Sequence, residues 1–344
     1  AQFLYYDLGR SYAVGTANVL FPPTEASPDV DASAEFKGYV LRLTLNYEFS
    51  DIAMPASYGH LPDSSEFAVA VGVRGGFSNG SSRWNLYGTS GAEASRLTYH
   101  NTEAGVAEVY AGIEDRTGLY GRAYAGVGRM SGGTLQDEDF PPGITPYSST
   151  NSSQQYGSLS YGTIDVGYFG YQAAGYKVGG FAGWNFLHEE LNAFGCTQTA
   201  TNPDVCTAGL VAANNLGISD NDSWNAPRLG VVGEASAGGF TFRAEAAWLP
   251  IIYFNGDNSH FLRIPQDFSG PLPQSGIGHN GYELEADIDY WISPNLTLGV
   301  GARYWSLNAR GNTQWQEVNV NDVALGSTFE TERFEAYAQT AYHF

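Results

Sequence analysis

The stretch Phe334-Glu-Ala-Tyr-Ala-Gln-Thr-Ala-Tyr-His-Phe344 decides the fold. Its apolar or small residues alternate with polar ones, among them Glu335, Gln339 and His343, and a β-strand has this period of two. One face of such a strand suits lipid, and the other suits a wet, polar interior. A tilted strand of about ten residues is long enough for a closed barrel to cross a bilayer. The stretch therefore predicts one strand of a transmembrane β-barrel.

The composition of the 344 residues supports this prediction. Aromatic residues make up 14% of the chain, and they suit the two interface girdles of a barrel. No apolar run reaches the length of about 18 residues that a transmembrane helix needs. A soluble all-β protein could share the composition, but its alternating strands would usually be shorter. The net charge of −20 argues against nucleic acid as a partner, because binding a phosphate backbone needs a basic face.

Twelve strands are predicted, joined alternately by tight turns and long polar loops. They are residues 2–15, 36–50, 65–87, 93–113, 119–136, 157–171, 176–194, 223–237, 239–256, 280–292, 295–310 and 329–344. The sequence therefore favours a single outer-membrane barrel domain over 1–344, with an extra N-terminal hairpin in 1–64. The alternative is a ten-strand ring with 1–64 as an N-terminal extension. Because bacterial barrels have short periplasmic turns and long extracellular loops, we expect the long loops to face the cell exterior.

Many charged residues fall on the predicted inward faces of the strands. A dry interior could not hold so many charges unless they paired with one another. The favoured interpretation is an ion-pair network that fills a narrow lumen, and the alternative is a selective ion path. The residues concerned are Arg42, Glu48, Arg243, Glu245, Glu283, Glu285, Asp287, Asp289, Arg303 and Glu335.

Cys196 and Cys206 lie ten residues apart in a polar, turn-rich segment. We expect a local disulfide, which implies an oxidising compartment, and two free thiols are the alternative.

Two segments carry residue types that could support catalysis. Asp137 and Asp139 are two residues apart, so both carboxylates point the same way on a continuing strand. Such a pair can share a proton and orient a water molecule, or it can bind calcium. The second segment holds Asp257, Asn258 and His260, and a histidine can act as a general base near neutral pH.

From about Ser65 to Phe344 the chain resembles the omptins, the ten-stranded outer-membrane proteases of Gram-negative bacteria. The segments that carry the resemblance are Gly133-Thr-Leu-Gln-Asp137-Glu-Asp139-Phe140 and Asp257-Asn-Ser-His260. The resemblance implies that Asp137 and Asp139 activate water on one wall of the barrel and that a histidine–aspartate couple containing His260 acts on the other. It also implies an activating lipopolysaccharide, bound by basic residues of the outer wall such as Lys177 and His188. No metal or organic cofactor is expected.

The chain departs from the omptin pattern at three positions. Asn258 stands where the family has the aspartate of the couple, and Asp257 would face away from His260 unless a β-bulge intervened. Trp84 and Gly256 stand where acidic residues line the family's substrate pocket. These differences leave two main hypotheses, a surface endopeptidase of altered specificity and a non-catalytic barrel with a structural, adhesion or lattice-forming role. The first would bind extracellular peptides or proteins, the second suits an oligomer, and a narrow porin is a third hypothesis.

Overall fold

The structure is a computed structural model that describes residues 14–18, 30–37, 40–47, 67–140, 145–201, 206, 211–318 and 322–344. The chain divides into two compact units, Ala1–Ala56 and Ser57–Phe344. In the described part of the chain, no helix is long and apolar enough to span a membrane.

The larger unit is one antiparallel sheet of thirteen strands. Its strands are β4 (Phe67–Tyr87), β5 (Glu93–Asp115), β6 (Leu119–Asp139), β7 (Ser148–Gln154), β8 (Ser158–Ala173), β9 (Tyr176–Gln198), β10 (Leu216–Ala237), β11 (Phe240–Leu249), β12 (Ile252–His260), β13 (Leu272–Gly278), β14 (Gly281–Ser293), β15 (Leu296–Trp315) and β16 (Val323–His343).

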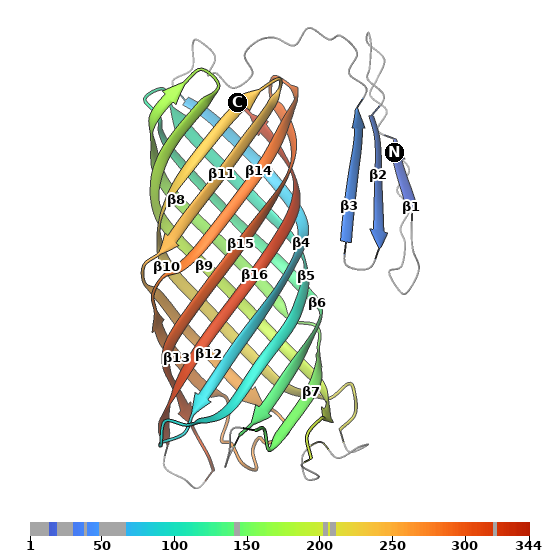
Figure 1. Ribbon diagram of the computed structural model, residues 1–344, viewed down its shortest axis with the longest axis vertical. Coiled ribbons are helices and arrows are strands. Elements are labelled where there is room, and N and C mark those ends of the chain that lie inside the picture. Colours follow the sequence, from blue (N-terminus) through green and yellow to red (C-terminus); the bar gives the residue numbers. More distant parts are fainter. Residues whose placement is uncertain are drawn as a thin grey trace. The chain divides into compact units, whose positions relative to one another are not determined.

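The sheet closes into a ring of ten wall positions (Figure 1). Their order is β4, β5, β6, β8, β9, β10, β11, β14, β15 and β16, and β16 pairs with β4 from Ser327↔Leu86 to His343↔Ala70. The short strands β7, β12 and β13 continue the wall positions of β8, β11 and β14. The all-β closed barrel predicted from the sequence is therefore confirmed. Its strand number is that of the ten-strand alternative and not the favoured twelve, because β16 and β4 meet directly and leave no edge for a further hairpin.

The smaller unit contains β1 (Val14–Asn18), β2 (Val30–Lys37) and β3 (Val40–Tyr47). These strands form their own antiparallel sheet in the order β1-β2-β3. The hairpin predicted at 2–15 and 36–50 lies partly outside the described residues, as do Glu48 and the side chain of Arg42.

The two ends of the barrel differ in their connections. Tight turns at 115–119, 173–176, 237–240 and 293–296 join strands at the end that we call the turn end. These are the turns predicted from the sequence, where Gly, Asn and Pro cluster between alternating runs. The longer connections lie at the opposite end, the loop end.

Exposed apolar side chains form a band around the half of the barrel nearest the turn end. On β16, Phe334 and Tyr342 are exposed while Glu335 and Gln339 are buried, as the alternation of this strand predicted. Other members of the band are Val71, Val73, Phe77, Val109, Ile113, Val127, Ile164, Val166, Leu229, Val231, Leu284, Leu298 and Val300. On β6, Asp137 lies ten residues beyond Val127, so the strand continues well past the band toward the loop end.

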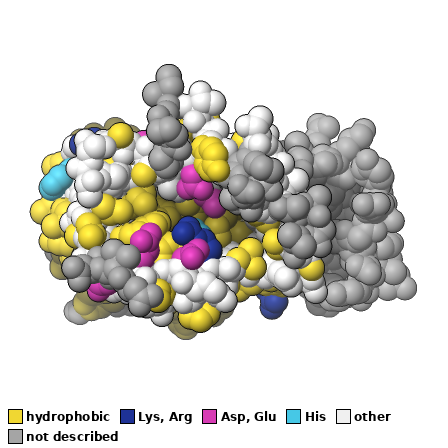
Figure 2. All heavy atoms as spheres, turned by 90° about the horizontal axis from the view of Figure 1, so that it is seen from below, with side chains coloured by type: hydrophobic (Ala, Val, Ile, Leu, Met, Phe, Trp, Pro, Cys, Tyr) yellow, Lys and Arg dark blue, Asp and Glu magenta, His cyan; other side chains and the backbone are white. Residues whose placement is uncertain are grey.

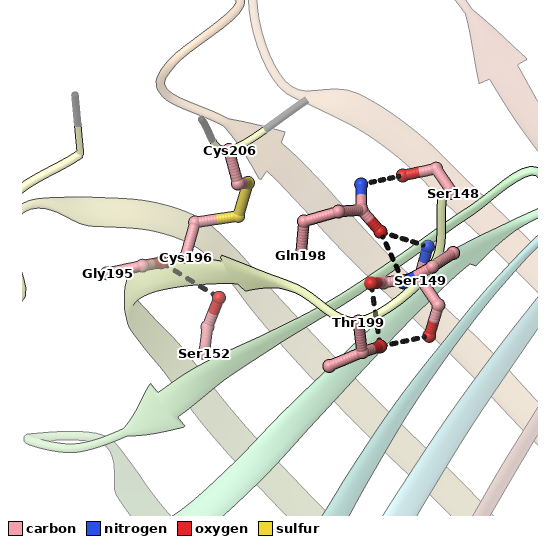
Figure 3. Close-up of a disulfide and its surroundings, with 9 residues drawn as sticks. Ser148, Ser149, Ser152, Gly195, Cys196, Gln198, Thr199 and Cys206 are labelled. Atoms are coloured by element: carbon pink, nitrogen blue, oxygen red, sulfur yellow. Dashed lines mark hydrogen bonds between the residues drawn. A yellow bond between two sulfur atoms is a disulfide. The ribbon is translucent and has the colours of Figure 1, made fainter. Parts of the chain in front are cut away.

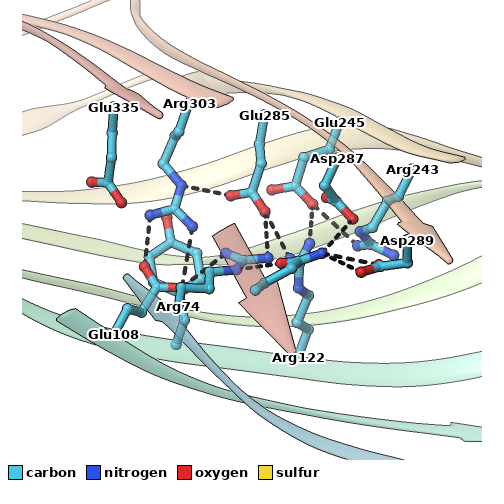
Figure 4. Close-up of polar contacts among 12 residues, drawn as sticks. Arg74, Glu108, Arg122, Arg243, Glu245, Glu285, Asp287, Asp289, Arg303 and Glu335 are labelled. Carbon is cyan, nitrogen blue, oxygen red and sulfur yellow. Dashed lines mark hydrogen bonds and ion pairs between the residues drawn. The ribbon is translucent and has the colours of Figure 1, made fainter. Parts of the chain in front are cut away.

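Inside the band, the lumen is filled by buried arginine and carboxylate side chains (Figure 4). Arg303 binds Glu285 at 2.6 Å and Glu108 at 2.8 Å, and Arg74 binds the same two carboxylates at 3.1 and 2.8 Å. Arg122, Arg228 and Arg243 continue this network toward Glu245 at 3.0–3.1 Å. Arg243, Glu245, Glu283, Glu285 and Arg303 thus form ion pairs in the lumen, as the ion-pair interpretation predicted. Asp287 and Asp289 instead accept hydrogen bonds from Gln339, and Glu335 accepts one from Tyr161.

The expected disulfide between Cys196 and Cys206 is present, with a Cα–Cα distance of 5.5 Å (Figure 3). Next to it, the Ser149 amide donates to Gln198 at 3.0 Å and the Thr199 hydroxyl donates to the Ser149 carbonyl at 2.8 Å. The disulfide-bonded end of β9 is therefore fastened to β7 at the loop end.

Candidate functional site

Asp137 and Asp139 face the lumen at the loop end because β6 contains an irregularity. Between Tyr124 and Met130 the buried side chains of β6 have even numbers. The pairing of β5 with β6 then shifts near His100 and Glu103, and Gly133 has a φ of +138°. Beyond the shift, Leu135 is fully buried, and Asp137 and Asp139 share its face. The shift therefore turns the odd-numbered residues inward, and both aspartates end on the luminal side.

The facing wall is made by β10 and β12, which pair in an unbroken register from Ile218↔His260 to Asn225↔Tyr253. Asp220, Asp222 and Asn258 are almost completely buried, and His260 lies on the same face as Asn258. Asp257 lies on the outward face and is exposed. The β-bulge that would have turned it inward is absent from this pairing, so Asp257 does not join the other candidate residues.

Tyr99 of β5 joins the two walls. Its side chain is 2% exposed, and its hydroxyl lies between two acceptors, the carbonyl of Leu191 at 3.4 Å and the carboxylate of Asp220. Asn258 donates from Nδ2 to Oδ1 of the same carboxylate at 2.7 Å. Asp220 is thus held by donors from both sides of the lumen, above the arginine network and beyond the apolar band.

Burial changes the protonation of the aspartates at the loop end. It raises the pKa of Asp137 to about 8, helped by the neighbouring carboxylate of Asp139 and opposed by Arg263. Burial also raises the pKa of Asp139, while the Ser95 hydroxyl and Arg263 oppose it. The pKa of Asp220 rises to about 6 through burial, against the hydrogen bonds from Asn258 and Tyr99. Burial and the charge of Asp220 raise the pKa of Asp222 well above its usual range. Protons are therefore retained among these carboxyl groups at neutral pH, as in a carboxyl dyad.

His260 is neutral in this setting. Burial and the nearby Arg263 lower its pKa to about 3. The centroid of its ring lies 5.6 Å from that of the buried Phe268 ring. Its Nδ1 atom is buried without a hydrogen-bond partner. Because Arg263 also acts on Asp137 and Asp139, it links His260 electrostatically to the aspartate pair. Figure 2 shows this end as a hollow in which acidic and basic side chains are visible.

The residues at the positions of the omptin substrate pocket are both luminal. Trp84 is 6% exposed, and its indole Nε1 is buried without an acceptor. Gly256 pairs with Asp222, whose Oδ1 lies 2.6 Å from where a Cβ at 256 would be placed. That oxygen is buried and has no hydrogen-bond donor. A carboxylate therefore occupies the space beside Gly256, although it comes from the neighbouring strand.

The basic side chains Lys177 and His188 occupy different faces of β9. Lys177 points inward, where it pairs with Glu114 and Glu234, so only His188 of the two basic residues lies on the outer face. The described residues contain no group of three His, Cys, Asp or Glu side chains that could hold a metal ion.

Sequence reasoning missed Asp220, Asp222 and Tyr99. The segment Ser219-Asp-Asn-Asp-Ser223 has the composition of a loop, and the predicted strand began only at 223. In the structure it pairs on both sides, with β9 and with β12. The detectable signal was the Asp-x-Asp spacing, which is the same as that of Asp137 and Asp139.

Comparison with known proteins supports the fold. The chain is similar to the outer-membrane protease OmpT from Escherichia coli, with a TM-score of 0.66 and 15% identity over 84% of this chain and 100% of that one. A weaker likeness is to the translocator domain of autotransporter NalP from Neisseria meningitidis, with a TM-score of 0.34 and 9% identity over 82% of this chain and 90% of that one. Another is to the outer membrane protein OprG from Pseudomonas aeruginosa, with a TM-score of 0.27 and 11% identity over 80% of this chain and 95% of that one. No protein-family model matches the sequence, and no curated protein matches it. At these identities the likeness shows an outer-membrane barrel fold and leaves the function open.

Proposed function

We propose that this protein is an outer-membrane endopeptidase whose active site opens at the loop end of the barrel. One observation carries the proposal. Carboxyl groups of β6 (Asp137 and Asp139) and of β10 (Asp220 and Asp222) lie at the loop end of the barrel, where the charge of Asp220 acts on Asp137. Burying several carboxyl groups without a cation beside each one destabilises a fold, and strongly raised carboxyl pKa values are typical of functional sites.

The chemistry would be the attack of a water molecule on a peptide carbonyl. The ionised member of the Asp137–Asp139 pair orients the water, and the protonated member donates a hydrogen bond toward the carbonyl oxygen. As the water oxygen bonds to the carbonyl carbon, the neutral ring of His260 accepts the released proton. That proton then passes to the leaving amine as the C–N bond breaks, so each group returns to its starting state.

The proposed setting follows from the surface of the barrel. The apolar band would sit in the outer membrane of a Gram-negative bacterium, with the loop end outside the cell. Lipopolysaccharide is the proposed lipid partner, and extracellular peptides or proteins are the proposed substrates. If the buried side chains of Asp222 and Trp84 line the substrate site, substrate residues with a cation or an aromatic face suit it.

The direct test is peptide cleavage by refolded protein, with and without lipopolysaccharide. We expect cleavage of a peptide library by the wild type and a loss of at least about 100-fold in the Asp139→Asn and His260→Ala variants. Asn221→Ala, which alters an exposed neighbour of Asp220, should cleave normally. If both site variants cleave as well as the wild type, the proposed site is wrong.

The second candidate function is a non-catalytic structural or adhesion barrel. It is favoured by Asn258 at the position where the resemblance implies an aspartate. Absence of cleavage by the wild type under every condition, with a correctly folded barrel, would select this function over the peptidase.

A further inference from the structure

Among the residues that the structure describes, the buried Nδ1 atom of His260 has no carboxylate partner of the kind that a catalytic histidine normally has. We propose that Asp220 serves as that carboxylate from the neighbouring strand and acts as a positioning residue for His260 through the side chain of Asn258. The catalytic role of Asp220 in this inference rests on the proposed function. Its structural content, a chain of contacts from Asp220 through Asn258 to His260, can be tested without activity.

The first contact is between Asp220 and Asn258. The two residues are direct partners in the β10–β12 ladder, on the luminal face, and are 3% and 0% exposed. The Asn258 amide donates from Nδ2 to Asp220 Oδ1 at 2.7 Å. Because a carboxylate can only accept hydrogen bonds, this pairing determines which end of the amide faces Asp220. The amide oxygen must then point away from Asp220.

The second contact fixes Asp220 itself. The hydroxyl of Tyr99, which also lies 3.4 Å from the Leu191 carbonyl, donates a hydrogen bond toward the carboxylate from the opposite side of the lumen. Two donors to one carboxylate favour its ionised form and hold its orientation. Burial raises the pKa of Asp220 to about 6 against these two hydrogen bonds, so above this pH Asp220 is a negatively charged and immobilised end of the chain of contacts.

The third contact is implied by two buried atoms that lack partners. Oδ1 of Asn258 and Nδ1 of His260 are both buried without a hydrogen bond. The residues lie two apart on one face of β12, where neighbouring side chains are within reach of each other or of one bridging water. An amide oxygen accepts and a protonated Nδ1 donates, so the two orphan atoms are complementary. Satisfying both places the imidazole proton on Nδ1 and leaves Nε2 free to accept a proton.

The arrangement also accounts for the amide at position 258. An aspartate there would face Asp220 directly across the ladder, and two buried like charges repel. With Asn258 the pair contains one charge and one good hydrogen bond. The amide orients the imidazole, and the charge of Asp220 behind it supplies the stabilisation of the imidazolium that an amide alone lacks.

The experiment exchanges the two side chains. Asp220→Asn removes the charge, Asn258→Asp creates two facing carboxylates, and the double variant Asp220→Asn/Asn258→Asp restores one charge and one amide in exchanged positions. Asn221→Asp is the matched control, because it adds a carboxylate one residue away on the exposed face. Correct folding is checked by the heat-dependent shift of the barrel in gel electrophoresis.

The first readout is the tautomer of His260, from ¹⁵N spectra of histidine-labelled protein assigned with His260→Ala. We expect the Nδ1–H tautomer in the wild type, in Asn221→Asp and in the double variant, and a mixture in Asp220→Asn. An unchanged Nδ1–H tautomer in folded Asp220→Asn would overturn the proposal. So would an Nε2–H tautomer in the wild type.

The second readout is peptide cleavage as a function of pH. Asp220→Asn should lower kcat about 100-fold with little change in KM, and the double variant should recover most of the loss. If the wild type cleaves nothing, the proposed function fails while the tautomer still decides the role of Asp220. If the wild type cleaves and the double variant is no better than Asp220→Asn, the role of Asp220 is wrong and the proposed function stands.

Discussion

Asp222 and Gly256 face each other across the β10–β12 ladder, and Oδ1 of Asp222 lies 2.6 Å from the position that a Cβ atom would take at residue 256. A side chain at 256 and the carboxylate at 222 therefore compete for one space. The absence of a side chain at Gly256 leaves room for the carboxylate of Asp222.

Gly256→Ala should lower the free energy of unfolding by about 1–3 kcal/mol, because the added methyl group meets Asp222 and the ring of Phe254. Urea unfolding in lipid vesicles would measure the change. Gly233→Ala on β10 is the control, since a Cβ there meets nothing within 4 Å. Adding Asp222→Ala should reduce the cost of Gly256→Ala, and an equal cost in both backgrounds would contradict the competition for space.

Asp222→Asn should change substrate preference more than overall turnover. The buried Oδ1 of Asp222 has no donor, so a cationic substrate side chain would be its partner. We expect kcat/KM for peptides with Lys or Arg at the cleavage site to fall about 10-fold relative to matched neutral peptides. Equal losses for both peptide series would show that Asp222 does not contact the substrate side chain.

The contribution of Asp137 to the free energy of unfolding should fall as the pH rises from about 4 to about 8, whereas His260, with its lowered pKa, acts in the opposite direction below about 6.5. Burial raises the pKa of Asp137 to about 8, so between its unfolded value and 8 the native state keeps a proton that the unfolded chain has released. Asp220, with a pKa of about 6, acts in the same direction. Asp137→Asn should therefore flatten the curve of unfolding free energy against pH in this range. A curve of unchanged slope would mean that Asp137 is ionised in the native barrel.

Removing one partner of a luminal ion pair should lower the free energy of unfolding substantially. Arg303→Ala leaves Glu285 and Glu108 short of a buried counter-charge, and we expect a loss of about 3–5 kcal/mol of unfolding free energy. The control is Arg83→Ala, whose pair with Glu330 at 3.7 Å is about half exposed and should contribute no more than about 0.5 kcal/mol. Similar effects of the two substitutions in urea titrations would contradict the buried network.

Alternation identified the strands and their faces because a barrel wall has only an inside and an outside. Glu335 and Gln339 were placed correctly for that reason. The alternation of inward and outward residues no longer predicts the face of a residue once a strand is interrupted. Glu245 and Asn258 are both luminal although one has an odd and the other an even number, because the wall is interrupted between Leu249 and Ile252.

The candidate site was predictable only in part for the same physical reason. Asp137, Asp139 and His260 were predicted as candidates from residue type, spacing and the omptin resemblance, whereas Asp220 belongs to a segment whose strand conformation comes from pairing with two neighbours. The strand number also depended on a long-range event, the meeting of β16 with β4, which no local pattern encodes.

The arginine and carboxylate side chains that fill the lumen have a consequence for the passage of a polypeptide through the barrel. Under the proposed function, a polypeptide substrate that reached Asp137 from the loop end would be stopped by the buried ion pairs and could not pass through to the turn end. The substrate would have to enter and leave through the loop end. Only a flexible segment that can bend into the lumen and back out could therefore place a peptide bond beside Asp137. Compact folded proteins would be spared except at their protruding, mobile stretches.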